Sequence, residues 1–316
     1  MRLKLFFLAV LLICAAFFGL TQGSVNIPFD ELFLAQNKPI ISLRLLRILV
    51  AVIAGGGLAV SGIALQAILR NPLAEPYLLG TSNGAGLGAI LAVIIGLNKL
   101  CFPLAAFLGA IITIILVYQL AREGNKIPIQ SLILSGIIVS IAFSGIIVFL
   151  ISISQNQALF GVTWWLWGSM QPYDLRLLLI VSPVVLLGVL IIYLLSQDLN
   201  AISVGEEEAM HLGIKTETIK KILFLVTSLI TASLVSICGI IGFVGLIVPH
   251  TIRLVVGPNH RALIPAGFLA GAAFMIACDL ISRTLFSPLE LPIGVVTALI
   301  GVPIFIVLLK TKQRVK

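Results

Sequence analysis

The chain has 316 residues and a formal net charge of +8, yet only 10% of its residues are charged and 60% are hydrophobic. Its mean hydropathy of +1.20 excludes an ordinary soluble domain. No aromatic-interleaved basic groove accompanies the positive charge, so nucleic acid is not indicated as a partner. The composition therefore predicts a protein embedded in membrane lipid.

Long uncharged segments follow one another along the chain. A membrane-spanning helix needs about 20 mostly apolar residues, and continuous apolar runs favour helices over a β-barrel. The segment 127–173 divides into a span and a Trp-rich extracytoplasmic segment, and the segment 222–252 breaks around Gly239 and Gly242. We predict an all-α polytopic protein that forms one domain over residues 1–316. Its ten predicted spans are 5–29, 48–69, 76–98, 100–121, 128–152, 177–197, 219–239, 243–255, 262–278 and 291–309.

The first apolar segment begins like a secretory signal, but no small-x-small cleavage site follows it cleanly. We interpret it as an uncleaved first span. With the N-terminus in the cytoplasm, fourteen Lys and Arg residues fall on the cytoplasmic side and six on the other. Positively charged residues are retained on the cytoplasmic side of short loops, so both termini are predicted to be cytoplasmic.

Several patterns have a simpler explanation than a reactive site. Residues 84–89 match a dinucleotide fingerprint, but that motif needs a strand before it. Gly80, Gly84 and Gly88 are spaced by four residues, which predicts a flat helix face that permits close packing of another helix. The four cysteines are scattered singly, and no histidine has a second ligand at helical spacing, so neither a metal site nor a disulfide is predicted.

The chain shows no motif of an enzyme. It lacks a phosphate-binding loop, a nucleophile elbow and paired catalytic carboxylates. Asp279 directly follows the predicted span 262–278, and Arg283 comes four residues later on the same helical face, where the two side chains can pair. The scarcity of buried acids argues against an ion-coupled carrier. If the protein is a pump, its energy must come from another subunit.

Four segments carry a resemblance to a known family. They are SLRLLRILVAVIAGGGLAVSGIALQAILRNPLAEPYLLGTSNGAGLG at 42–88, the loop beginning at Asp198, GFVGLIVPHTIRLVVGPNHR at 242–261 and LELPIGVVTALIGVPIFIVLL at 289–309. Together they closely resemble the FecCD-like permeases of type II ABC importers, which import iron-siderophores, haem and cobalamin. One departure is visible, because Leu46 replaces a proline that the family usually has between its two arginines.

The resemblance implies an architecture and its partners. It predicts a homodimer in the bacterial or archaeal cytoplasmic membrane that binds two ATPase subunits and an extracytoplasmic binding protein, with no cofactor of its own. Ferric siderophore is the most frequent substrate of the family. Haem or cobalamin import by the same architecture is the alternative, and a secondary transporter using helix breaks at Pro249 and Pro303 is a remote one.

The resemblance also assigns roles to particular residues. The loop at about 198–216 matches the family's ATPase-coupling pattern at Gly205, Ala209, Leu212 and Gly213, whereas its acidic run starting at Glu206 is also common in solvated loops. A short amphipathic helix there could present Ala209, Met210 and Leu212 to a groove of a partner. Arginines matching Arg44, Arg47 and Arg283 dock the binding protein in the family, although snorkelling or an internal pair with Asp279 is the simpler interpretation. Candidate pathway residues are Ser135, Ser140, Ser144, Thr297 and Gly301.

Overall fold

The computed structural model describes residues 2–25, 27–31, 34–97, 101–124, 126–154, 158–171 and 174–314. Within these residues the protein is helical and contains no strand beyond two isolated bridges. The prediction of an all-α polytopic protein is confirmed. The α-helices are α1 Arg2–Thr21, α2 Lys38–Ile68, α3 Thr81–Ile94, α4 Phe102–Ala121, α5 Ile129–Ile153, α6 Ala158–Leu166, α7 Leu175–Leu194, α8 Ser196–Val204, α9 Glu206–His211, α10 Thr216–Cys238, α11 Val244–Val256, α12 His260–Thr284 and α13 Ile293–Arg314.

Seven of the described helices are long and apolar enough to cross a membrane, namely α1, the segment Ala35–Ile68 that contains α2, α4, α5, α7, α10 and α12. Three shorter apolar helices, α3, α11 and the described part of α13, correspond to the remaining predicted spans. Short 3-10 helices lie at Phe29–Glu31, Ala35–Asn37 and Pro76–Leu79, the last of which we call η3. The predicted span ends at residues 98 and 100 fall outside the described residues.

The largest boundary difference concerns α2, which begins at Lys38 rather than near residue 48. The hydropathy criterion stopped at Arg47, whereas the helix continues through both arginines. Leu46 lies inside this helix, where a proline would remove a backbone donor and disturb the preceding turn. The predicted break between α10 and α11 is present, with Gly239 ending α10 and Phe243 preceding α11.

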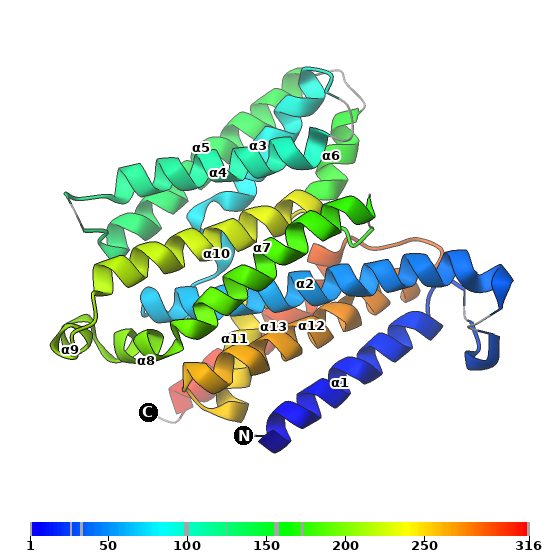
Figure 1. Ribbon diagram of the computed structural model, residues 1–316. Coiled ribbons are helices and arrows are strands. Elements are labelled where there is room, and N and C mark those ends of the chain that lie inside the picture. Colours follow the sequence, from blue (N-terminus) through cyan, green and yellow to red (C-terminus); the bar gives the residue numbers. More distant parts are fainter. Residues whose placement is uncertain are drawn as a thin grey trace.

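Helix α2 is the centre of the bundle (Figure 1). In its most apolar stretch of 18 residues, 89% of the residues are buried inside the protein. The corresponding share is 11% for α1, which lies at the edge of the bundle against α12 and α2. At Gly62 of α2 an added Cβ would overlap the backbone of Gly245 in α11. Glycine therefore allows α2 and α11 to approach at backbone distance.

A second close contact joins α3 to α4. An added Cβ at Gly84 would lie 2.6 Å from the carbonyl oxygen of Gly109, and one at Gly88 would overlap the carbonyl oxygen of Ala105. Gly80 differs from its two neighbours in the motif, because it precedes α3 with a φ of +75° and serves the turn. The spacing of four thus describes two helix-packing residues and one turn residue.

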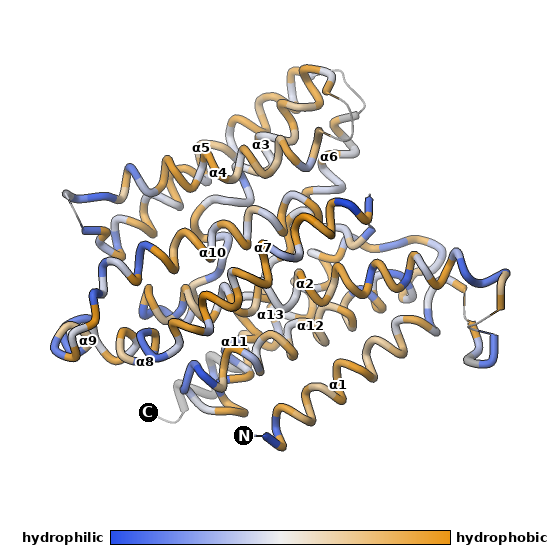
Figure 2. Tube along the Cα trace, in the orientation of Figure 1, coloured by the Kyte–Doolittle hydropathy of each residue, from blue (hydrophilic) through white to orange (hydrophobic). Residues whose placement is uncertain are grey.

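The bundle has two distinct ends (Figure 1). The described start of α1 and the described end of α13 lie at the same end of the bundle as α8 and α9, and we call this the terminal end. Helix α6 and the connection between α1 and α2 lie at the opposite end, which we call the α6 end. The long helices are predominantly hydrophobic between these ends, and hydrophilic residues gather at the connections (Figure 2). Large apolar side chains also remain exposed along α1 and α5, as expected for helices that face lipid.

Candidate functional site

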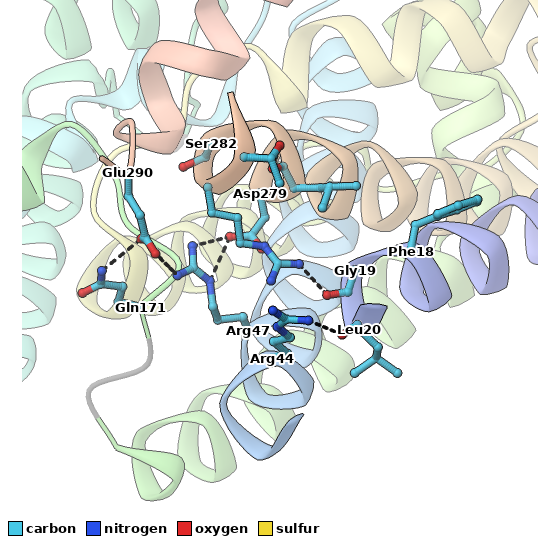
Figure 3. A network of polar contacts seen from close by, with 12 residues as sticks. Phe18, Gly19, Leu20, Arg44, Arg47, Gln171, Asp279, Ser282 and Glu290 are labelled. Atoms are coloured by element: carbon cyan, nitrogen blue, oxygen red, sulfur yellow. Dashed lines mark hydrogen bonds and ion pairs between the residues drawn. The ribbon is translucent and has the colours of Figure 1, made fainter. Parts of the chain in front are cut away.

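An ion-pair network at the α6 end joins α2 to α12 and to the segment before α13 (Figure 3). The guanidinium of Arg47 contacts Asp279 Oδ1 at 2.7 Å and Glu290 Oε1 at 3.0 Å. Arg283 Nε lies 3.2 Å from the other oxygen of Asp279, so the predicted pairing of these two residues is present. Gln171 also donates to Glu290, from Nε2 at 3.0 Å. The network therefore connects α2, the residues after α6, the end of α12 and the segment before α13.

The charge environment of Glu290 follows from these contacts. Burial alone would raise the pKa of this carboxyl group, but the hydrogen bond from Gln171 and the positive charge of Arg47 outweigh it and lower the pKa. Glu290 is therefore ionised at neutral pH and remains 35% exposed, whereas Asp279 is only 2% exposed. The Arg47–Glu290 pair therefore reaches solvent through Glu290, whereas the Arg47–Asp279 pair lies between the packed helices α2 and α12.

Arg44 and Arg283 are buried. Arg44 donates to the carbonyl oxygens of Leu20, Thr21 and Val25, which lie at or just beyond the end of α1. Arg283 donates to the carbonyl oxygen of Gly19 in the same region. Both guanidinium groups thus hold the end of α1 against α2 and α12. Binding-protein docking through the three arginines stays a prediction, and Arg47 is the one whose partner Glu290 reaches solvent.

An apolar cavity of about 700 Å³ lies beside α13. Trp167, Ile240 and Phe243 line one side, and Ala298, Leu299 and Val302 of α13 line another. Backbone contacts fix its rim: Gly294 donates to the carbonyl oxygen of Trp167 at 3.0 Å. None of the residues lining the cavity carries a charge, so its walls suit a bulky and weakly polar molecule.

The predicted pathway residues do not form one surface. Ser135 and Thr297 are buried, and an added Cβ at Gly301 would lie 2.5 Å from the Ile247 side chain. Ser140 is half-buried and donates to the carbonyl oxygen of Gly136, whereas Ser144 is exposed. The cavity is lined by Ala298 and Val302 of α13, which directly follow Thr297 and Gly301 in the sequence, so Thr297 and Gly301 lie on a neighbouring face of the helix. A pathway role for these residues stays a prediction.

The predicted coupling loop forms two short helices, α8 and α9, joined at Gly205. Ala209 is fully buried, whereas Met210 and Leu212 are 53% and 74% exposed. Of the three residues predicted to face a partner, Met210 and Leu212 are therefore the two whose side chains are accessible. Gly213 ends the segment with a φ of +80°, a conformation that glycine adopts without steric cost.

A buried lysine anchors α9 to the rest of the protein. Lys220 of α10 contacts Glu206 Oε2 at 3.0 Å and forms a second ion pair with Glu217. The other oxygen of Glu217 accepts a hydrogen bond from the backbone nitrogen of Ile127 at 3.2 Å, just before α5 begins. This set of contacts, which we call the Lys220 strut, links α9 to the base of α5.

Two charged residues in these sites were missed from the sequence, namely Lys220 and Glu290. Each lies at the edge of an apolar segment, where hydropathy carries no information about its partner. Their partners lie up to 243 residues away, as for Arg47 and Glu290. The cluster of Arg44, Arg47 and Arg283 could have indicated Glu290, because buried positive charges require acceptors.

Comparison with known proteins places this geometry in context. A model of the FecCD transport family matches residues 10–311. The chain is 38% identical over 278 residues to the cobalamin import system permease protein BtuC of Halobacterium salinarum, covering 86% of this chain and 73% of that protein. It is 34% identical to the hemin transport system permease protein HmuU of Yersinia pestis, covering 99% of this chain and 97% of that protein.

A solved structure is also similar over its whole length. It is described as an inward-facing conformation of an ABC transporter of metal-chelate type. The two structures share a TM-score of 0.88 and 35% sequence identity, and the match covers 98% of this chain and 99% of the other. The similarity therefore includes all elements that form the two ends and the cavity.

Proposed function

The chain belongs to the FecCD transport family, and on this premise we propose that it forms the translocation pathway for a ferric siderophore. Members of this family are permease components of ABC importers for metal chelates, cobalamin, haem or similar substrates, and they are multi-pass proteins of the cytoplasmic membrane rather than enzymes. The match over nearly the whole chain is the observation that carries the proposal.

The cavity beside α13 supports a bulky chelate over a small oxyanion. An oxyanion needs backbone N–H groups or guanidinium groups to replace its water, and the cavity walls are apolar. A large chelate already encloses its metal ion and needs space with weak contacts. A volume of about 700 Å³ provides such space within one protomer.

Three partners complete the proposed importer. Two copies of the permease enclose one pathway, as a two-fold axis allows. Separate ATPase subunits dock on the exposed side chains Met210 and Leu212 at the terminal end, which is then cytoplasmic. A binding protein delivers the substrate at the α6 end. Arg47 is the arginine best placed to meet it, because the Glu290 carboxylate that it now holds is partly exposed.

Uptake into proteoliposomes tests the proposal. The permease would be reconstituted with its ATPase and its binding protein, and ATP-dependent uptake of a ferric siderophore, haem, cobalamin and molybdate would be compared. We expect siderophore uptake that requires all three components. Uptake of haem or cobalamin instead would support the alternative substrates. Uptake driven by an ion gradient without the ATPase would overturn the importer assignment.

A further inference from the structure

Phe243 has an unusual backbone conformation. Its φ of +70° and ψ of −22° lie in the left-handed region, and among the described non-glycine residues only Arg70 also has a positive φ. A bulky aromatic residue adopts this region at an energetic cost. Such residues persist where the surrounding structure holds them, and they gather at functional sites.

The segment between α2 and α3 supplies what holds Phe243. The backbone nitrogen of Phe243 donates to Glu75 Oε1 at 2.6 Å. Two residues earlier, the backbone nitrogen of Ile241 donates to Tyr77 Oη at 3.2 Å. On the other side, Gly301 has no side chain, and a Cβ there would lie 2.8 Å from Phe243 Cβ. Two side-chain acceptors therefore fix the break between α10 and α11.

The Glu75 carboxyl group is held by this contact rather than by a cation. The ion pairs among the described residues do not include it. Burial raises the pKa of Glu75, while the hydrogen bond from Phe243 acts in the opposite direction. The amino-terminal end of α11, which Phe243 precedes, also favours a negative group. Glu75 is in none of the ion pairs among the described residues, so breaking its contact with Phe243 would leave no cation without its partner.

Phe243 lies where a change of its backbone matters. With Gly242 it lines the apolar cavity, together with Leu299 and Val302 of α13. A return of φ to the ordinary negative region would redirect the Cα–Cβ bond and move the ring relative to the cavity. We propose that Phe243 gates this cavity and that Glu75 is the positioning residue that latches it in the strained conformation. The proposal rests on the proposed function only in taking the cavity as part of the pathway.

Cysteine labelling tests the latch without any substrate. In protein whose four native cysteines are replaced by alanine, Val302→Cys would be labelled with a water-soluble maleimide in detergent. We expect Glu75→Leu to change the labelling rate roughly fivefold or more, the population change expected when a modest strain is released. Glu75→Gln should label like the parent, because its amide oxygen still accepts from Phe243. Leu212→Cys, exposed at the terminal end, serves as the control site and should not respond.

A second background shows whether Glu75 acts through Phe243. Phe243→Ala removes the ring, so Glu75→Leu should add nothing to it. An effect of Glu75→Leu that persists without the ring, or an unchanged rate in its presence, would overturn the proposal. If Glu75→Leu does not fold, Tyr77→Phe removes only the acceptor of Ile241 and should shift the rate in the same direction, and no shift would count against the latch. Because labelling needs no transport, failure here is distinguishable from failure of the proposed function.

Discussion

The three arginines at the α6 end show how partners decide what the same side chain does. Arg47 bridges one buried and one partly exposed carboxylate. Arg283 shares the buried carboxylate and also donates to the end of α1. Arg44 is buried with carbonyl oxygens as its partners. Guanidinium suits all three roles because it stays charged and presents several donors in a fixed plane.

We predict that Arg44→Met destabilises the protein by about 2 kcal/mol, the typical contribution of hydrogen bonds to a charged group. The substitution leaves the carbonyl oxygens at the end of α1 without donors and removes a positive charge from the carboxyl-terminal end of a helix. Thermal unfolding in detergent measures this effect. Arg176→Met is the control, because Arg176 is exposed. Equal melting temperatures for the two variants would contradict a structural role for Arg44.

The positions of these arginines could be read from the sequence, but their partners could not. Positive charge on the predicted extracytoplasmic side is unusual under the positive-inside rule, so the sequence alone indicates this cluster. Only the pair of Arg283 with Asp279 is local, at four residues of separation, and it alone was predicted. The contact of Arg47 with Glu290 depends on how α2 and α12 pack, and helical periodicity carries no such information.

At the scale of elements, the Lys220 strut gives α9 a physical connection to the start of α5. It consists of two ion pairs and one backbone hydrogen bond, and it joins α9, α10 and the start of α5. A rigid connection of this kind can pass a displacement of α9 to α5 because Lys220 is buried and its carboxylate partners are partly shielded from water.

We predict that Lys220→Met separates ATP hydrolysis from uptake. Without the ammonium group, Glu206 and Glu217 repel each other, so α9 loosens from α10 while Met210 and Leu212 stay exposed for docking. Hydrogen exchange should accelerate in residues 198–217 and at the Ile127 amide, and the assembled transporter should hydrolyse ATP with reduced uptake. Lys215→Met is the control, since Lys215 is exposed. Unchanged exchange in the Lys220 variant would show that the strut does not hold α9.

The elements themselves were largely predictable, because long apolar runs and glycine breaks are properties of the local sequence. The interruption near Gly239 and Gly242 appeared as expected, since Gly239 has a φ of +69°. The start of α2 was wrong by about ten residues. Its first turns contain arginines whose charges are compensated by distant residues, and a hydropathy window cannot anticipate that compensation.

At the scale of the whole molecule, the two ends are built for different contacts. The α6 end carries the ion pairs of Arg47 and Arg283. The terminal end carries α8 and α9 (Figure 1), and the Met210 and Leu212 side chains there are exposed. The apolar cavity and the latched break are built by α13 and by the α10–α11 connection. The proposed importer therefore separates substrate delivery, gating and ATPase docking along one molecule.

This separation predicts where the ATPase binds. Replacing both Met210 and Leu212 with glutamate should abolish co-purification of the ATPase, because charge in an apolar groove must be desolvated. The permease itself should keep its melting temperature, since both side chains are exposed. Ala209→Arg would not test the same point, as Ala209 is fully buried and an arginine there would disrupt the loop.

The matched control replaces Leu285 and Phe286 with glutamate, because they are 61% and 58% exposed at the opposite end of the molecule. These substitutions should leave ATPase binding intact. Loss of binding in the control but not in the α9 variant would show that the ATPase binds at the α6 end, which would contradict the proposal.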